Sequence, residues 1–206
     1  MKKLILIIIL LISVTTAYSN TAVVGSMWKQ IGTILFPADD ITAIDFTGVS
    51  TIGIAEGEDY ILIRDEKASG ITGGSFTSGA WRTRDLNTIV TDIGSHASIA
   101  SNQITLAGGT YKVEGYAPGM GVNEHKIKLR NITDGVDLVI GTSMHASATG
   151  PTNSISTLDG RFTIAAPKVL ELQHRSFGSQ ATYGFGTTCS FGVIEVYSVI
   201  KFWKEA

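Results

Sequence analysis

The most regular feature of the chain is an alternation of apolar and polar residues in short runs that end at Gly, Asn or Asp. In one such run Ile127 and Leu129 share one parity, whereas the cations Lys126, Lys128 and Arg130 share the other. A period of two is typical of a strand with one buried and one solvated face. We therefore expect the three cations to lie mostly in solvent.

The same alternation recurs through the second half of the chain. In residues 168–175, one face carries Leu170, Leu172 and His174, and the other carries Glu171, Gln173 and Arg175. Further strands are expected from residues 136, 160 and 191, and no segment after residue 20 has a convincing helical stripe. Short strands separated by turns such as Asp134-Gly135 predict an all-β fold of two sheets, with a jelly roll as the leading topology.

Residues 99–129 contain the clearest pair of strands. One passes through Ile104 and Leu106 and the next through Tyr111 and Val113, with Ala107-Gly108-Gly109-Thr110 between them. Paired glycines supply the backbone freedom of a tight turn. The pattern predicts two adjacent strands joined by a short connection.

The last apolar run, residues 191–203, is hydrophobic on both parities. Ile200 and Phe202 lie on one side, and Tyr197, Val199 and Trp203 lie on the other. A strand that is apolar on both faces is buried on both faces. Either a loop or the N-terminal segment covers the second face, or Tyr197, Val199 and Trp203 form an interface with another subunit.

The N-terminus has the pattern of an export signal. Lys2 and Lys3 precede an apolar run from Leu4 to Val14, which is short for a membrane span and is followed by small and polar residues. We expect a signal peptide over residues 1–19, with an uncleaved anchor as the alternative, and no membrane span after cleavage. The Gly- and Ser-rich connector at 68–75 then divides a β-rich extension or stalk, 20–70, from a main domain, 71–206.

Composition narrows the functional classes. The formal charge of −2 argues against a nucleic-acid partner, because such proteins normally need a basic surface. The single cysteine, Cys189, cannot form an internal disulfide and is expected to be a small buried hydrophobe.

The histidines do not indicate an enzyme. His96, His125, His145 and His174 are far apart and form no metal-binding spacing, although His125 and His174 share the inward parity of their strands. Histidines of the core or of an interface are the preferred interpretation over metal ligands. The acidic clusters lack a calcium-loop spacing, and no serine lies in a nucleophile elbow. We expect no catalytic residues, metal or cofactor.

Two features could bind a ligand. In Trp81-Arg82-Thr83-Arg84-Asp85, the indole could stack on a sugar while Arg82 and Arg84, on one side of a strand, bind a carboxylate. The preferred interpretation is that Trp81 packs in the core and that the arginines pair with Asp85 or with a neighbouring chain. Binding residues are instead expected in the Gly-, Ser- and Asn-rich stretches 115–124, 144–154 and 177–183.

Four ordered motifs together resemble a domain found near the C-termini of bacteriophage tail-fibre and related virion proteins. They are GGSFTSGAWRTRDLNT (73–88), ASNQITLAGGTYKVEGYAPGMGVNEHKIKLRNIT (100–133), GRFTIAAPKVLELQHR (160–175) and YGFGTTCSFGVIEVYSVIKFWKE (183–205). The segment ITLAGGTYKVEG more distantly resembles the corresponding strands of tumour-necrosis-factor and complement-type jelly rolls.

This resemblance implies a trimeric β knob that displays loops to a receptor. Together with the leader, it predicts an exported, non-enzymatic homotrimer that is secreted, periplasmic or on the cell surface, or part of a virion if a phage encodes it. The expected partner is a cell-surface receptor, with carbohydrate as the favoured ligand. The alternative is a purely structural decoration or assembly protein.

Overall fold

The computed structural model describes residues 59–205, and every regular element in that range is a β-strand. The strands are β1 (Asp59–Lys67), β2 (Arg82–Thr83), β3 (Thr88–Asp92), β4 (Ala97–Ala100), β5 (Gln103–Leu106), β6 (Gly109–Met120), β7 (Asn123–Asn131), β8 (Val136–Ile140), β9 (Met144–Ala146), β10 (Asn153–Ile164), β11 (Lys168–Ser176) and β12 (Glu195–Glu205). The predicted signal peptide and residues 20–58 of the predicted extension lie outside the described range.

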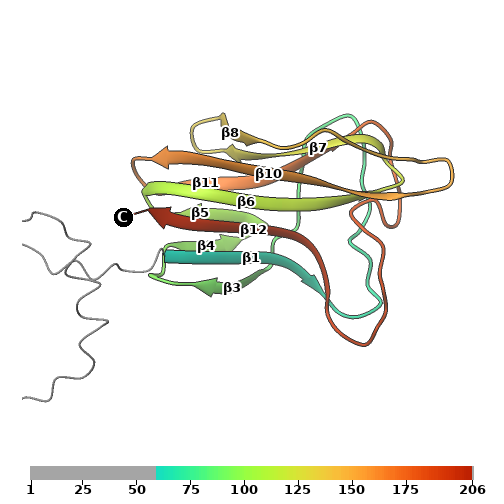
Figure 1. Ribbon diagram of the computed structural model, residues 1–206, viewed down its shortest axis with the longest axis horizontal. Coiled ribbons are helices and arrows are strands. Elements are labelled where there is room, and N and C mark those ends of the chain that lie inside the picture. The colour runs from blue at the N-terminus through green and yellow to red at the C-terminus, as the bar shows by residue number, and fades with distance from the viewer. Residues whose placement is uncertain (1–58, 206) are drawn as a thin grey trace, which may run out of the picture. The chain divides into compact units, whose positions relative to one another are not determined.

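The strands form two antiparallel sheets that pack face to face (Figure 1). One sheet has the order β10-β6-β12-β1-β3, and the other has the order β4-β5-β11-β7-β8, with β2 beside β11 and β9 beside β7. From β5 onward the chain passes repeatedly between the sheets, which is the topology of a jelly roll. The predicted all-β jelly-roll sandwich is confirmed.

The core lies between the two sheets and follows the predicted parities. Ile127 and Leu129 of β7, Leu170 and Leu172 of β11, and Phe202 of β12 are all fully buried. Each strand buries alternate residues because its successive side chains point to opposite faces of the sheet. Burial of these apolar side chains is the main stabilising contribution to the sandwich.

The strands on either side of Gly108-Gly109 do not pair with each other, so the prediction of two adjacent strands is wrong. β5 pairs with β4 and β11, whereas β6 pairs with β10 and β12 in the opposite sheet. The short connection therefore crosses the core at one end of the sandwich. Gly108 permits this crossing, because a Cβ atom there would lie 3.1 Å from the backbone oxygen of Ala165.

Residues 59–67, at the end of the predicted extension, form β1. This strand lies between β12 and β3, and its residues Ile61 and Ile63 are fully buried in the core. β1 is therefore an integral part of the five-stranded sheet. No helix in the part of the chain that the structure describes is long and apolar enough to cross a membrane.

Candidate functional site

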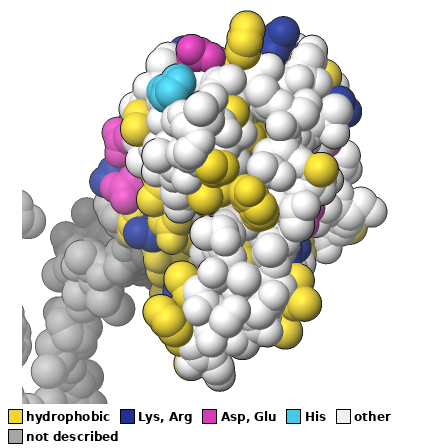
Figure 2. Space-filling model, turned by 90° about the vertical axis from the view of Figure 1, so that its right-hand side faces the viewer, with side chains coloured by type: hydrophobic (Ala, Val, Ile, Leu, Met, Phe, Trp, Pro, Cys, Tyr) yellow, Lys and Arg dark blue, Asp and Glu magenta, His cyan; other side chains and the backbone are white. Residues whose placement is uncertain are grey.

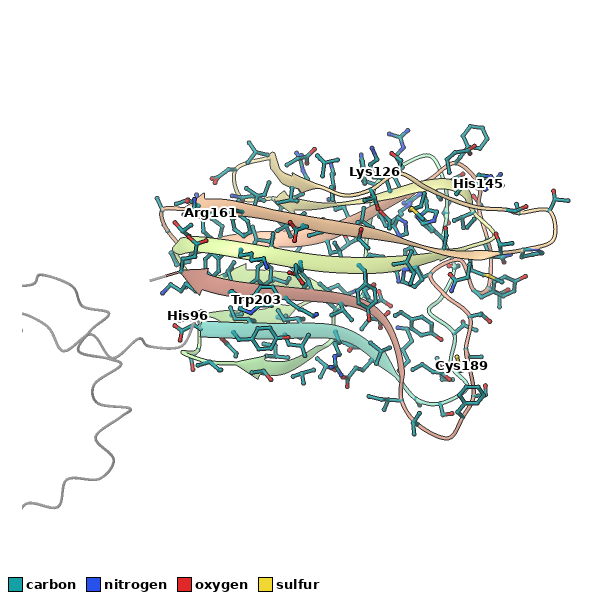
Figure 3. All side chains as sticks on the ribbon, in the orientation of Figure 1. His96, Lys126, His145, Arg161, Cys189 and Trp203 are labelled. Carbon is teal, nitrogen blue, oxygen red and sulfur yellow. The ribbon has the colours of Figure 1, made fainter. Side chains whose placement is uncertain are left out.

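A surface groove of about 930 Å³ lies at one end of the seven-stranded sheet. It is bounded by β7, β9 and β11 and by the segment that leads into β2. Lys126 and His145, which line it, lie near the loop-bearing end of the domain (Figure 3). The lining residues are Ser78, Gly79, Trp81, Glu124, His125, Lys126, Ser143, Met144, His145, Arg175, Ser176 and Phe177.

The groove is lined by residues from several segments that are far apart in the sequence. Two of the expected binding stretches contribute to it, through Met144 and His145 and through Phe177. The stretch 115–124 contributes Glu124 only, and it is not a loop as expected. Its residues up to Met120 belong to β6, and β7 begins at Asn123.

Trp81 lies at the groove and not in the core, so the preferred interpretation of this residue is wrong. Its side chain is half-buried, and its ring centroid lies 4.3 Å from Nζ of Lys128. A cation over an indole face is attracted by the ring quadrupole. Lys128, expected in solvent, is consequently buried beneath the indole and also contacts Asp137 Oδ1 at 2.8 Å.

The floor of the groove contains a cross-strand pair of cations. Lys126 of β7 and Arg175 of β11 are register partners on the outer face of the sheet. Asp137 contacts both other cations of β7, Lys128 and Arg130. No ion pair joins Lys126 or Arg175 to a carboxylate among residues 59–205.

Phe177 forms an exposed aromatic rim, with 77% of its surface accessible. Its backbone N–H donates to the Glu124 carbonyl at 2.8 Å, and the N–H of Gly178 donates to the Val122 carbonyl at 2.8 Å. These bonds fix the turn after β11 against the start of β7. The ring is thus held at the groove by its backbone and not by side-chain packing.

A buried histidine pair lies below the groove. Nδ1 of His125 is 2.9 Å from Nε2 of His174, and Nε2 of His125 is 2.7 Å from Oγ of Ser154. The His174 ring also stacks against Phe185 and packs on Phe76. The prediction that both histidines point inward is confirmed.

Burial and the nearby Arg84 charge keep these imidazoles neutral. Desolvation is the larger cause, and together the two lower the pKa of His125 to about 4 and the pKa of His174 well below its usual 6.5. Neutral imidazoles suit a packing role beneath the groove. No group of three or more metal-ligating side chains is found within the described residues.

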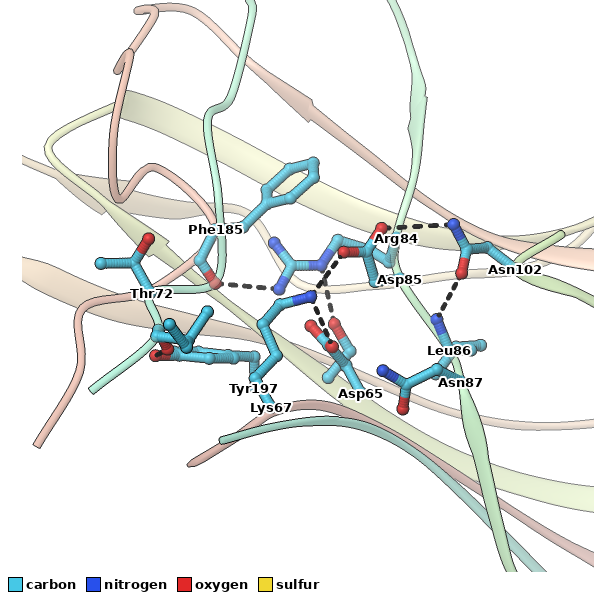
Figure 4. A network of polar contacts seen from close by, with 12 residues as sticks. Asp65, Lys67, Thr72, Arg84, Asp85, Leu86, Asn87, Asn102, Phe185 and Tyr197 are labelled. Atoms are coloured by element: carbon cyan, nitrogen blue, oxygen red, sulfur yellow. Dashed lines mark hydrogen bonds and ion pairs between the residues drawn. The ribbon is translucent and has the colours of Figure 1, made fainter. Parts of the chain in front are cut away.

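Arg84, from the same motif as Trp81, is completely buried between the sheets. Its guanidinium donates to Ser198 Oγ at 2.7 Å and to the Pro118 carbonyl at 3.3 Å. It also donates to the Phe185 carbonyl at 2.9 Å (Figure 4). It also lies over the Phe185 ring, 3.9 Å from the centroid. Arg82 is exposed, so the two arginines do not act on one face as the sugar-binding interpretation assumed.

The carboxylates of Asp65 and Asp85 lie near Arg84, and Lys67 forms ion pairs with both of them. Nζ of Lys67 lies 3.1 Å from Asp65 Oδ1 and 2.8 Å from Asp85 Oδ2 (Figure 4). Burial raises the pKa of Asp65, an effect that the charges of Lys67 and Arg84 oppose. This network ties β1 to the segment between β2 and β3, and so it supports the position of Trp81.

The candidate interface residues lie on the face of β12 that points away from the core. Tyr197 and Val199 are each 4% exposed in the single chain, and the Tyr197 hydroxyl donates to the Ile71 carbonyl at 2.8 Å. Trp203, labelled in Figure 3, is half-buried. Its ring centroid lies 5.3 Å from that of Tyr60. The chain itself therefore covers Tyr197, and Trp203 offers the larger free surface.

Cys189 is exposed, so the expectation of a buried thiol is wrong. The reason is the loop before β12, whose N–H groups at Cys189 and Ser190 donate to the Glu195 carboxylate at 3.1 and 2.8 Å. Because the backbone turns inward around Glu195, the Cys189 side chain points outward.

The same loop end carries other exposed apolar side chains. Phe191, Val193 and Ile194 are 82%, 66% and 55% exposed. Figure 2 views the domain from the right-hand end of Figure 1, where hydrophobic side chains are scattered over a surface with few charges.

Neither the known protein families nor the curated proteins include a significant sequence match to this chain. Solved structures with a similar arrangement include murine APRIL at pH 5.0, PRD1 vertex protein P5 and the globular domain of zebrafish complement 1qA protein. Their TM-scores are 0.47, 0.48 and 0.45, at sequence identities of 8%, 13% and 12%. Each alignment covers 72% of this chain and 98 to 99% of the other. The likeness is one of fold alone.

Proposed function

We propose that this chain is an exported, non-enzymatic knob that binds a carbohydrate of a cell surface through the groove. The observation that carries the proposal is the placement of Trp81 beside polar and charged side chains in an open groove. Indole rings pack well on the apolar faces of sugars, and the polar neighbours can bond hydroxyl groups. Phe177 supplies a second aromatic surface at the rim.

We also propose that the knob is a homotrimer, as the resemblance of the sequence to tail-fibre domains implies. The outer face of the five-stranded sheet is the expected contact surface. Since Tyr197 and Val199 are already covered in the single chain, the contact would depend mainly on Trp203 and on its neighbours Tyr60 and Lys112. Three copies would multiply a weak single-site affinity.

A glycan array probed with the purified protein tests the binding proposal. We expect binding that Trp81→Ala abolishes and that Phe191→Ala, which removes an exposed aromatic ring outside the groove, leaves unchanged. Binding that survives Trp81→Ala would contradict the proposed site.

Light scattering tests the trimer. The wild-type protein should have three times the mass of one chain, and Trp203→Ala should produce monomers, because it removes the largest apolar side chain of the expected contact surface. If the wild-type protein is a monomer, the proposal that three copies strengthen a weak single-site affinity is wrong.

The second candidate is a structural role on a virion or other extracellular surface. It is favoured by the exposed apolar loop of Phe191, Val193 and Ile194, since such side chains commonly mark contacts with other proteins. A trimer that binds no glycan of the array would favour this role.

A further inference from the structure

We infer that the groove selects an anionic sugar, one whose pyranose ring carries a carboxylate or sulfate group. This inference rests on the proposed function and specifies its ligand. It starts from Lys126 and Arg175, which face each other across neighbouring strands. Like charges directly opposite each other in a sheet are destabilising, so the pair needs an explanation.

The surrounding carboxylates do not neutralise this pair. Asp137 is committed to Lys128 and Arg130, and Glu171 accepts hydrogen bonds from Gln103 and Gln173. Glu124 is the one carboxylate among the groove-lining residues, and its cross-strand partner is His145. Glu124 shares the outer face of β7 with Lys126, two residues away, so it offsets at most one of the two cations and the groove keeps a net positive charge.

The indole lies next to this charge. β2 pairs with β11 so that Thr83 opposes Gln173 and Arg82 opposes His174, and continuing this register brings Trp81 opposite Arg175. The order across the outer face is then Trp81, Arg175 and Lys126. A sugar ring stacked on Trp81 would direct an anionic substituent towards the two cations, where the arginine can bond it with two parallel N–H groups.

The arrangement fits an acidic glycan better than a nucleic acid. A nucleic acid would need a longer track of free cations for successive phosphates, but the next two cations along β7 are already paired with Asp137. One aromatic platform beside one pair of cations matches a single charged sugar.

The test measures binding of the purified protein to three polymers: neutral dextran, dextran sulfate and alginate, whose sugars carry carboxylates. We expect dextran sulfate or alginate to bind at least about tenfold more tightly than dextran, with affinity falling as salt increases. Whether the sulfate or the carboxylate polymer binds more tightly distinguishes the two anionic groups.

The matched variants are Lys126→Gln/Arg175→Gln in the groove and Arg161→Gln/Lys168→Gln outside it. Both remove two positive charges, and the second pair lies at other ion pairs, with Glu205 and Asp134. The groove variant should lose about tenfold or more in affinity for the acidic polymer, and the control should lose less than about twofold. The melting temperature of the groove variant should not fall, because a repulsion has been removed.

Equal binding to dextran and dextran sulfate, or equal losses in the two variants, would overturn the inference. If a neutral glycan binds and Trp81→Ala abolishes this binding while Lys126→Gln/Arg175→Gln does not, the proposed function stands and the inference is wrong. If no glycan binds, both are wrong. Equally tight binding to phosphatidylserine vesicles would show general attraction to anions and would also overturn the selection of a sugar.

Discussion

Nδ1 of His125 lies 2.9 Å from Nε2 of His174, and at 4% and 0% exposure the two imidazoles are shut off from bulk solvent. They come from adjacent strands, β7 and β11, and sit between the groove and the packed interior. Their protonation is therefore coupled to the stability of the fold around the groove.

Acid should destabilise the domain because of this pair. The pKa of His125 falls from 6.5 to about 4 on folding, so the unfolded chain binds more protons than the folded chain between these values. Stability is fully present above pH 6.5 and declines as the pH falls towards 4, by about 3 kcal/mol for this group. Urea unfolding at a series of pH values measures the decline.

The control for this pH dependence is His145→Gln, which removes an exposed imidazole whose charge is the smallest of the three causes that lower the pKa of His125, so most of the decline should remain. His125→Gln should lower the stability at neutral pH but flatten the decline below pH 6.5. A flat wild-type profile between pH 7 and 4 would contradict the assignment of neutral, buried imidazoles.

Replacement of Arg84 should be strongly destabilising. Arg84→Met leaves the carbonyls of Phe185 and Pro118 and the hydroxyl of Ser198 without their buried donor, and Lys67 remains as the cation beside Asp65. The expected loss is about 3 to 5 kcal/mol in the free energy of unfolding, measured with urea. Arg82→Met, at an exposed site of the same segment, should change it by about 0.5 kcal/mol or less. Similar losses in both variants would contradict the buried network.

Alanine substitutions at two glycines with positive φ should distinguish the stability cost of backbone strain from the additional cost of a steric clash. Gly186 has φ +133°, and a Cβ atom there would overlap the Tyr197 ring, whereas Gly74 has φ +104° and nothing within 4 Å. Gly74→Ala should cost about 1 kcal/mol for the backbone alone. Gly186→Ala should cost about 2 to 4 kcal/mol, because the ring must also move. Equal losses of stability in the two variants would show that the Tyr197 ring can move aside without a cost. Thermal unfolding gives both values.

Glu195 should control the order of the loop before β12. Its carboxylate accepts hydrogen bonds from Thr188, Cys189, Ser190 and Gly70, and these bonds lower its pKa to about 2. Glu195→Ala should speed amide hydrogen exchange at Cys189 and Ser190 without affecting β7. Because the folded pKa is depressed, the carboxylate-held loop should persist in the wild type until the pH falls through about 2 to 4.5. Unchanged exchange in Glu195→Ala would show that the loop is held by other contacts.

Much of the fold could be predicted from the sequence because the pattern of each strand is local. The parities of Ile127, Leu129, Leu170 and Leu172 are correct, since alternation alone decides which side chains face the core. Which strands are neighbours is decided by the packing of the whole sandwich. For this reason the local pattern around Gly108-Gly109 predicts two adjacent strands, whereas the chain crosses the core after Leu106.

The site was harder to predict for the same reason. The parity of Lys126 and of Arg175 was correctly assigned, yet their juxtaposition depends on the pairing of β7 with β11, which no local pattern encodes. The preferred interpretation placed Trp81 in the core, but the core position belongs to the charged residue Arg84 and the indole lies at the surface. The buried guanidinium is tolerated here because Ser198 and two carbonyl groups from distant segments accept its hydrogen bonds.

The position of β12 in its sheet has a consequence for biosynthesis. β12 lies between β6 and β1, so it alone links the pair β10-β6 to the pair β1-β3. It is also translated after all other strands of the domain. Until β12 is made, the edge of β1 that pairs with it has no partner, and the five-stranded sheet closes only after β12 has emerged from the ribosome. Until then the free edges of β1 and β6 are open to mispairing with other chains, so slow release of the last residues would favour aggregation of this domain.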